Sequence, residues 1–277
     1  MRHEGLSNSD FERLRDLIYS ESGINLSSDK KTMMEIRIKR RLQNLGIRTF
    51  AEYCKNLFTQ QGKDQELVQL IDVITTNKTD FFRESAHFDY LVSKALPDLA
   101  ARKGANRKSL IWSAGCSTGE EPYTLAMVLS EYSEDLPGFG FRVLATDICT
   151  AVLNKAALGI FKSELLAPVP QNLRKKYFMR SRDPQSDLLR VVPEVRALIE
   201  FRRVNFMESD FGIGELPEII FCRNVIIYFD RPTQVRLLEK LTRHLAPGGY
   251  FFAGHSESLQ GMDLPLVPVA PAVYRKS

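Results

Sequence analysis

Residues 109–121, SLIWSAGCSTGEE, decide the fold of this chain. The apolar run 109–114 is typical of a short buried strand, and a loop bounded by Gly115 and Gly119 follows it. A helix is expected over 121–132. A strand that passes through a glycine-containing turn into a helix is typical of the nucleotide-binding edge of a parallel α/β sheet.

Strand and helix patterns keep alternating beyond this stretch. The later segments are expected as a strand at 141–146, a helix at 149–158, a strand at 219–222, a helix capped by Asp230, a strand at 250–254 and an edge strand at 273–276. Alternation at this spacing predicts the α/β class with a doubly wound, Rossmann-like parallel sheet.

Two regions depart from this alternation. Residues 1–76 read as helices without strands, with Ser9 and Glu12 as a capping box for the first helix, and predict a small all-α N-terminal domain. Residues 77–277 then form the α/β domain, with 77–85 as its linker. Within it, short apolar runs at 176–179, 188–192 and 199–204 predict a three-stranded antiparallel insertion over about 160–204.

The composition fits a folded globular protein, with 44% apolar and 26% charged residues among 277. No apolar run approaches the roughly 20 residues that span a bilayer, and the N-terminus lacks the apolar segment of a signal peptide. The four cysteines are scattered without a CxxC pair, so free buried thiols are expected. The histidines form no metal-ligand spacing, so no metal is expected.

The charge is concentrated in one place. Residues 29–48 carry seven basic and two acidic residues, a local charge of +5, and include Arg37, Arg40 and Arg41 on one predicted helix. Such a helix either faces an acidic partner or is a solvated surface. On the residues alone the solvated surface is the favoured interpretation.

The loop after the first strand favours one class of ligand. It lacks the GxGxxG spacing and carries Glu120 and Glu121 at the helix start, where a pyrophosphate would be repelled. A ligand with a sulfonium and an ammonium group would be attracted, which favours S-adenosylmethionine over NAD. Acidic residues also stabilise any first helical turn, so this interpretation stays open. Asp147, 28 positions after Gly119, is placed to accept hydrogen bonds from ribose hydroxyls, or to cap the next helix.

Five segments together resemble a known family. They are TNKTDFFRE at 76–84, STGEEPY at 117–123, ATDI at 145–148, CRNVIIYFD at 222–230 and GHSE at 254–257. In this order they resemble the signature of the CheR-type chemotaxis receptor methyltransferases, over about residues 10–275. The helical N-terminal part and the inserted sheet also fit that family.

The resemblance implies an enzyme. It would transfer the methyl group of S-adenosylmethionine to glutamate side chains of bacterial chemotaxis receptors, forming methyl esters and S-adenosylhomocysteine. Arg83 and Tyr228 would face the transferred methyl group. The implied cofactor-binding residues are Asn77, Thr79, Arg83, Glu121, Asp147, Asn205, Phe206, Arg223 and Asn224.

The resemblance also implies partners and a location. The protein would act in the cytoplasm at receptor arrays, on the methylation helices of chemoreceptors, with Arg37, Arg40 and Arg41 facing these acidic helices. A receptor C-terminal peptide is a candidate partner of the inserted sheet. We expect a monomer, no nucleic acid and no insertion into the membrane. An array adaptor without activity and a Rossmann-type oxidoreductase are the alternatives.

The expected chemistry needs no strong base. A glutamate side chain has an ordinary pKa near 4.3, so it is already a carboxylate at neutral pH. The enzyme's task is to position this nucleophile, and no His–Asp or Cys–His pair stands out in the sequence. We therefore expect no histidine to act as a general base.

Overall fold

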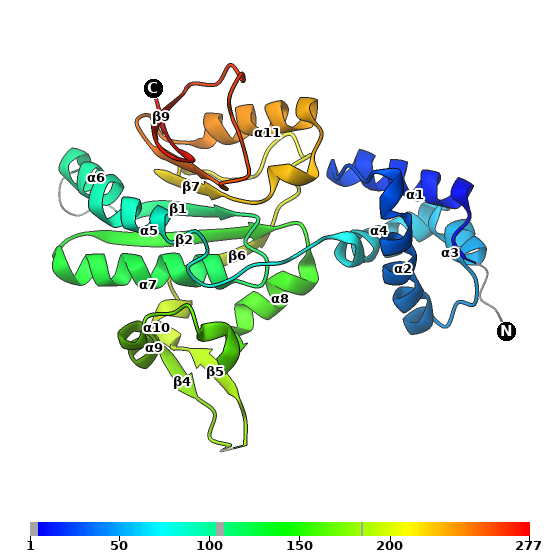
Figure 1. Cartoon of the computed structure of the whole chain (residues 1–277), viewed down its shortest axis with the longest axis horizontal. Helices are drawn as coiled ribbons and strands as arrows, with labels where there is room; N and C mark the ends of the chain where they lie inside the picture. Colours follow the sequence, from blue (N-terminus) through cyan, green and yellow to red (C-terminus); the bar gives the residue numbers. More distant parts are fainter. Residues whose placement is uncertain (1–4, 104–107, 184) are drawn as a thin grey trace.

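The computed structural model describes residues 5–103, 108–183 and 185–277. Its N-terminal part is all-helical, as predicted, and lies at the right in Figure 1. The elements are α1 (Asn8–Ser22), η1 (Ser28–Lys30), α2 (Lys31–Leu45), α3 (Phe50–Leu57) and α4 (Gln60–Ile74). Ser7 caps α1 by accepting from the Asp10 amide at 3.0 Å, so the predicted capping box at Ser9 is wrong by two positions.

The helical part has its own core. Met34, Ile38 and Leu42 form a buried stripe on α2 and pack with apolar residues of the other three helices. The spacing of this stripe is the i, i+4 repeat that places side chains on one face of a helix. Leu45, three positions after Leu42 and the last residue of α2, is exposed.

The second part is the predicted α/β sheet. Seven strands lie in the order β6-β2-β1-β7-β8-β10-β9, and the first five are parallel. Their bounds are β1 (Lys108–Ala114), β2 (Gly140–Asp147), β6 (Ile199–Arg203), β7 (Ile219–Cys222), β8 (Tyr250–Ala253), β9 (Leu266–Ala270) and β10 (Val273–Lys276). The strand at 273–276 is not at the edge as predicted, because β9 pairs with its outer side. Pro268 within β9 weakened the strand signal there.

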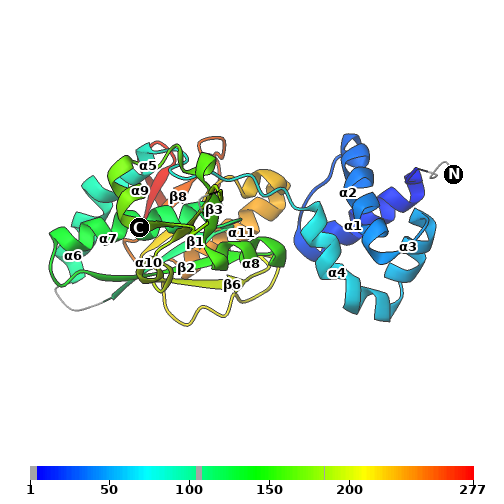
Figure 2. The ribbon, with the colours of Figure 1, turned by 90° about the horizontal axis from the view of Figure 1, so that it is seen from below.

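Helices cover both faces of this sheet (Figures 1 and 2). They are α5 (Ala86–Tyr90), η2 (Leu91–Ala95), α6 (Leu96–Lys103), α7 (Glu120–Asp135), α8 (Thr150–Leu158) and α11 (Arg231–His244). Successive strand residues enter opposite cores, as Ile111 packs with the α5–α7 side and Trp112 with the α11 side. This alternation is the period of two expected for strands buried on both faces.

The insertion forms a separate three-stranded sheet, ordered β3-β5-β4, that projects from the main sheet (Figure 1). Its elements are β3 (Ile160–Lys162), η3 (Ser163–Leu166), α9 (Gln171–Tyr177), β4 (Phe178–Arg180), β5 (Leu188–Val191) and α10 (Pro193–Arg196). The insertion was predicted, but not all of its strands. The segment 199–204 instead supplies β6, parallel to β2 in the main sheet, and the short β3 takes its place. Pro184, between the predicted runs at 176–179 and 188–192, lies outside the described residues.

The fold class is therefore the predicted one, an all-α N-terminal part followed by a Rossmann-like sheet with an antiparallel insertion. The four cysteines are free and buried, as expected. No helix in the described parts of the chain is long and apolar enough to cross a membrane. In the sheet, β1 lies between β2 and β7, and the order in which the chain adds strands reverses there. Ligands bind at such a switch point in open parallel sheets.

Candidate active site

A cavity of about 600 Å³ opens at this switch point. Three parts of the chain line it: residues 22–33 of the helical part, the linker after α4, and the carboxyl ends of the parallel strands. The lining residues include Asn77, Thr79, Arg83, Gly115, Ser117, Glu121, Asp147, Phe206, Arg223, Asn224 and Tyr228. Its size suits a cofactor-sized molecule.

The glycine loop lets the backbone approach this cavity. Gly115 and Gly119 have φ values of 89° and 103°, which are unfavourable for other residues. A Cβ on Gly115 would lie 2.4 Å from Cγ2 of Val225, and one on Gly119 would lie 3.0 Å from the Ala156 Cβ. Both positions therefore require glycine for space as well as for conformation.

Asp147 ends β2 and faces the cavity. One carboxylate oxygen accepts from the Ser117 amide and the other from the Cys149 amide, each at 2.9 Å. Burial raises the pKa of Asp147, while these amides oppose the rise. A carboxylate offers about four acceptor positions, so acceptor capacity remains for ribose hydroxyls. Ribose binding and capping of the following helix are therefore compatible functions for Asp147. Asp72 of α4 also contributes to capping α8, since it accepts from the Thr150 and Ala151 amides.

Glu121 and Arg223 form a buried ion pair at the cavity wall. Arg223 Nε donates to Glu121 Oε2 at 2.7 Å, and Ser113 Oγ donates to Glu121 Oε1 at 2.7 Å. The neighbouring Glu120 does not line the cavity, since it is buried and accepts from Thr118 Oγ1. Of the two carboxylates in the loop, only Glu121 lines the cavity.

Backbone strain is concentrated around the cavity. Among the described residues, five other than glycine have positive φ, and four of them lie in the signature segments: Phe82, Glu84, Ser117 and Asn224. Such conformations cost free energy and persist where surrounding contacts enforce them, commonly at functional sites. Two of these residues flank Arg83, so the linker backbone is fixed on both sides of this side chain.

Arg83 and Tyr228 both line the cavity. Arg83 Nη1 donates to the Lys78 carbonyl at 3.1 Å, and the Arg83 carbonyl accepts from Arg223 Nη1 at 2.7 Å. Tyr228 ends the short helix η4 (Ile226–Tyr228), and its carbonyl accepts from the Asn25 amide of the helical part. The two predicted catalytic side chains thus come from the linker and from the segment after β7.

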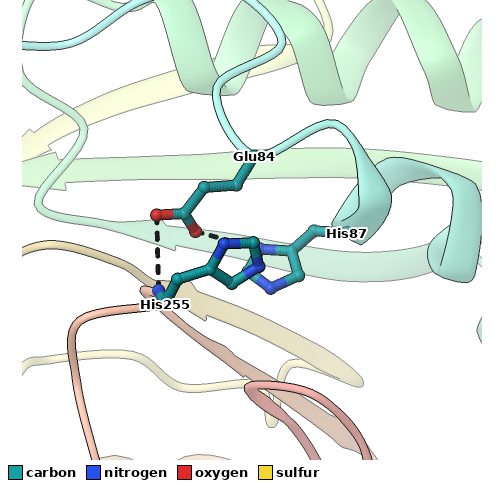
Figure 3. A group of neighbouring side chains, drawn as sticks. All are labelled: Glu84, His87 and His255. Atoms are coloured by element: carbon teal, nitrogen blue, oxygen red, sulfur yellow. Dashed lines mark hydrogen bonds and ion pairs between the residues drawn. The ribbon is translucent and has the colours of Figure 1, made fainter.

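Glu84, His87 and His255 form a cluster beside this wall (Figure 3). Their nitrogen and oxygen atoms lie within 4.8 Å of one another, a spacing that could serve a metal ion. The guanidinium of Arg223 already lies there, with Nη1 at 3.1 Å from His87 Nδ1 and 3.5 Å from Glu84 Oε2. A metal cation would be repelled by this fixed positive charge, so Glu84 and His87 are better described as partners of Arg223.

His87 is uncharged in this cluster. Burial is the main cause that lowers its pKa to about 4, and the charge of Arg223 adds to the shift. An arginine nitrogen can only donate, so Nδ1 of His87 must be the acceptor. The sequence provided no reason to single out this histidine.

Glu257, in the GHSE segment, was also missed. It is buried, and its carboxylate accepts from the amides of Val225 at 2.7 Å, Ile226 at 2.8 Å and Gly254 at 2.6 Å. Burial raises its pKa despite these bonds. Three backbone bonds to one carboxylate fix the loop that carries Asn224 and leads into Tyr228. No sequence signal beyond the family signature pointed to this function.

Asn205 and Phe206, two neighbouring residues among the implied cofactor-binding set, are placed differently from one another. Phe206 is buried and lines the cavity. The side chain of Asn205 instead donates to the Glu21 carbonyl of α1 at 2.6 Å and accepts from the Met207 amide at 3.0 Å. It joins the two parts of the molecule, and it is not among the lining residues.

The three arginines of the basic helix also differ. Arg41 forms a two-bond ion pair with Glu66 of α4, at 2.8 and 2.6 Å. Arg37 donates to the carbonyls of Ile74 and Thr75 and to Thr76 Oγ1. Arg40 is exposed. Only Arg40 of the three presents a guanidinium to solvent without a recorded partner among the described residues.

These residues fit S-adenosylmethionine. The buried carboxylates of Asp147 and Glu121 suit ribose hydroxyls and an ammonium group, Arg223 and Arg83 provide cationic groups for a carboxylate, and Phe206 provides an apolar surface. A pyrophosphate would meet Glu121 at the start of α7, which disfavours a dinucleotide.

Comparison with known proteins agrees with this geometry. Residues 77–270 match the family described as CheR methyltransferase, SAM binding domain, and residues 9–75 match CheR methyltransferase, all-alpha domain. A chemotaxis protein methyltransferase of Borreliella burgdorferi is 40% identical over 98% of this chain and 95% of its own length. Chemotaxis protein methyltransferase 2 of Pseudomonas aeruginosa is 43% identical over 96% and 92%, and the Escherichia coli chemotaxis protein methyltransferase 38% over 98% and 92%.

Proposed function

The chain belongs to the CheR methyltransferase family, and on this basis we propose that it methylates glutamate carboxylates of chemoreceptor helices from the cavity between its two parts. As a member of the family it is an S-adenosylmethionine-dependent chemotaxis protein methyltransferase, so the predicted family, enzyme class and cofactor are confirmed. The observation that carries the proposal is the meeting of Asp147, Glu121 and Arg223 with the linker residues Asn77 and Arg83 around one cavity.

Each wall of the cavity has a proposed role. Asp147 binds the ribose, Phe206 packs against the adenine, and Glu121 with Arg223 binds the amino acid end of the cofactor. Asn77, Thr79 and Asn224 complete the site from the linker and from the loop after β7. Asn205 acts indirectly, because its side chain is bonded to α1.

The acceptor needs to be positioned and does not need to be deprotonated. When bound, S-adenosylmethionine supplies a methyl group whose bonding electrons stay with the sulfur as a carboxylate oxygen of the acceptor bonds to the carbon. Arg83 attracts the acceptor carboxylate to the mouth of the cavity, and the Tyr228 hydroxyl orients it. His87 is an unsuitable base, since it is buried and its Nδ1 is occupied by Arg223.

The outer face of α2 is the proposed receptor-facing surface. Ile36, Lys39, Arg40 and Gln43 are exposed there at helical spacing, so one apolar and two cationic side chains lie together. This face suits an acidic amphipathic helix such as a glutamate-rich receptor helix. Of the three predicted arginines, the proposal keeps Arg40 as a direct contact.

The inserted sheet is a second proposed contact, for a receptor C-terminal peptide. Its exposed face carries the apolar side chains of Ile160, Met179 and Leu188 next to the basic Lys162 and Arg190. Strands β3 and β4 are both edges of this sheet, and an unpaired edge can add an extended peptide. An apolar peptide with a negative charge fits this surface.

The remaining expectations are part of the same proposal. We assign residues 1–76 to the receptor-facing domain and 77–277 to the catalytic domain, with the linker at 77–85. The protein acts as a monomer in the cytoplasm at receptor arrays, without inserting into the membrane or binding nucleic acid. The presence of Arg83, Glu121, Asp147 and Tyr228 around one cavity argues against an adaptor that has lost activity.

Labelled methyl transfer tests the proposed function. The protein is mixed with methyl-labelled S-adenosylmethionine and a soluble fragment containing receptor methylation helices. We expect label that alkali releases as methanol, the behaviour of a methyl ester, and no label on a fragment whose acceptor glutamates are replaced by glutamine. Arg83→Ala and Tyr228→Phe should both lose rate, and Tyr228→Phe should keep cofactor binding. Alkali-stable label, or label on the glutamine fragment, would contradict the carboxylate acceptor.

A further inference from the structure

Arg37 lies where the basic helix α2 meets the end of α4. Its Nη1 donates to the carbonyls of Ile74 and Thr75, the latter at 2.9 Å, and its Nη2 donates to Thr76 Oγ1 at 3.1 Å. Carbonyls in the last turn of a helix have no partner within the helix, and a cation there also complements the helix dipole. Arg37 thus fixes the end of α4 and the first residue after it.

The segment that Arg37 fixes continues directly into the cofactor cavity. Asn77 Nδ2 donates to Thr75 Oγ1 at 3.1 Å, and the Asn77 carbonyl accepts from Ser117 Oγ at 2.8 Å. The Ser117 amide in turn donates to Asp147 Oδ2 at 2.9 Å. An unbroken series of contacts therefore joins α2 to the proposed ribose-binding carboxylate.

Arg37 is itself not among the residues that line the cavity, whereas Thr75, Thr76 and Asn77 are. These linker residues therefore provide a hydrogen-bonded route from Arg37 to the cavity. Arg40, three positions later on the same helix, is exposed and offers a matched cation without these contacts.

We propose that Arg37 is a positioning residue for the cofactor site and not a receptor contact. Its guanidinium holds the α4 end and Thr76, and this sets Asn77 against Ser117 and Asp147. The basic helix then has two separate tasks, since Arg40 faces the receptor and Arg37 supports the cofactor cavity. This inference rests on the proposed function for the identity of the two ligands.

The affinity for S-adenosylhomocysteine and the KM for the receptor fragment, measured on three variants, test the assignment of Arg37. S-adenosylhomocysteine is titrated calorimetrically into the wild type and into Arg37→Ala, Arg37→Lys and Arg40→Ala, and KM for the receptor fragment is measured at saturating S-adenosylmethionine. Arg37→Ala should weaken S-adenosylhomocysteine binding about tenfold, the loss expected for charge-assisted hydrogen bonds, and leave the receptor KM unchanged. Arg37→Lys should recover part of the affinity, because an ammonium reaches the carbonyls but lacks the planar fork. Arg40→Ala should show the opposite pattern.

Two results would overturn the assignment. If Arg37→Ala lowers the melting temperature but binds S-adenosylhomocysteine normally while folded, Arg37 only caps a helix. If it raises the receptor KM as Arg40→Ala does, with cofactor affinity intact, Arg37 is a receptor contact. Should Arg37→Ala fail to fold, Arg37→Lys is judged by the same two criteria. If the wild type binds S-adenosylhomocysteine but methylates no receptor fragment, the proposed acceptor is contradicted. The S-adenosylhomocysteine titration of the Arg37 variants then still tests the positioning role.

Discussion

The cavity wall around Arg223 and the outer face of α2 both depend on arginine, but they hold it differently. Arg223 is buried and contacts Glu121, Glu84, His87 and the Arg83 carbonyl. Arg40 is exposed to solvent. A buried charge with fixed partners is already oriented before a ligand arrives, whereas an exposed charge attracts a partner from a distance and is screened by salt.

This difference shows that the contacts of a basic side chain, and not its position in a basic run of a helix, decide its role. Arg37, Arg40 and Arg41 belong to one basic run, yet Arg41 pairs with Glu66 and Arg37 with the end of α4. The structure divides the run into internal and external charges. Substitutions at buried cations should therefore affect folding and cofactor binding, and those at exposed cations should affect only the encounter with the receptor.

Removing Arg223 should have the largest effect. Arg223→Ala leaves Glu121 buried without its cation, and breaking a buried ion pair in this way costs about 3–5 kcal/mol. Urea denaturation should show a loss of this size, and calorimetry should show no measurable S-adenosylhomocysteine binding. The double variant with Glu121→Gln should recover part of the stability, because the unpaired charge is gone. A loss below about 1 kcal/mol would mean that this wall is not held by the pair.

The pH dependence of stability should reveal His87. Its folded pKa of about 4 lies below the ordinary value of 6.5, so between these pH values the unfolded chain binds more protons than the folded one. Stability from this group is therefore complete above pH 6.5 and falls as the pH drops toward 4, by at most on the order of 3 kcal/mol.

The matched variant for this measurement is His87→Asn, whose side-chain oxygen can still accept from Arg223. Urea denaturation at several pH values should show wild type losing stability relative to the variant between pH 6.5 and 4. Burial raises the pKa values of Asp147, Glu120 and Glu257, but these groups are present in both proteins, so their contribution cancels in the difference. If the free energies of unfolding of the two proteins run parallel over this pH range, His87 is not kept neutral by its surroundings.

The smallest effect is expected on the exposed face of α2. Arg40→Ala should raise the receptor KM about threefold, a change of under about 1 kcal/mol, with kcat and cofactor affinity unchanged. The difference from wild type should shrink as salt is added, because exposed charges are screened within about 10 Å at 0.1 M. Initial-rate measurements at low and high salt check both points. A salt-independent difference would indicate that Arg40 is buried in the receptor complex.

The fold could be predicted wherever a pattern repeats along the chain. The apolar run ending at Ala114 correctly indicated a buried strand, and the lack of strand patterns over residues 1–76 correctly indicated a helical part. β3 was missed because three residues are too few to show a period, and β6 was assigned to the insertion. Its pairing with β2 depends on residues more than fifty positions away.

The site could be predicted in part for the same reason. Asp147 is the last residue of β2, and Glu121 lies in the first turn of α7, the helix that follows β1, so the parallel sheet itself brings them to one edge. Asp72, Glu257 and His87 contact the site through folding of distant segments, and no local spacing announces them. The direction of a helix side chain also depends on neighbouring helices, so the sequence alone does not reveal the contacts of Arg37 with the end of α4.

Calorimetric titration of wild type and Asp147→Ala with S-adenosylhomocysteine tests most directly that the cavity is the cofactor site. The wild type should bind S-adenosylhomocysteine and not NADH. The folded Asp147→Ala protein should lose about 1.5–3 kcal/mol, roughly 10- to 150-fold in affinity, as charge-assisted bonds to the ribose are lost. Asp263→Ala, at an exposed position away from the cavity, is the control and should bind normally. Equal affinity in the folded Asp147→Ala and wild-type proteins would contradict the account.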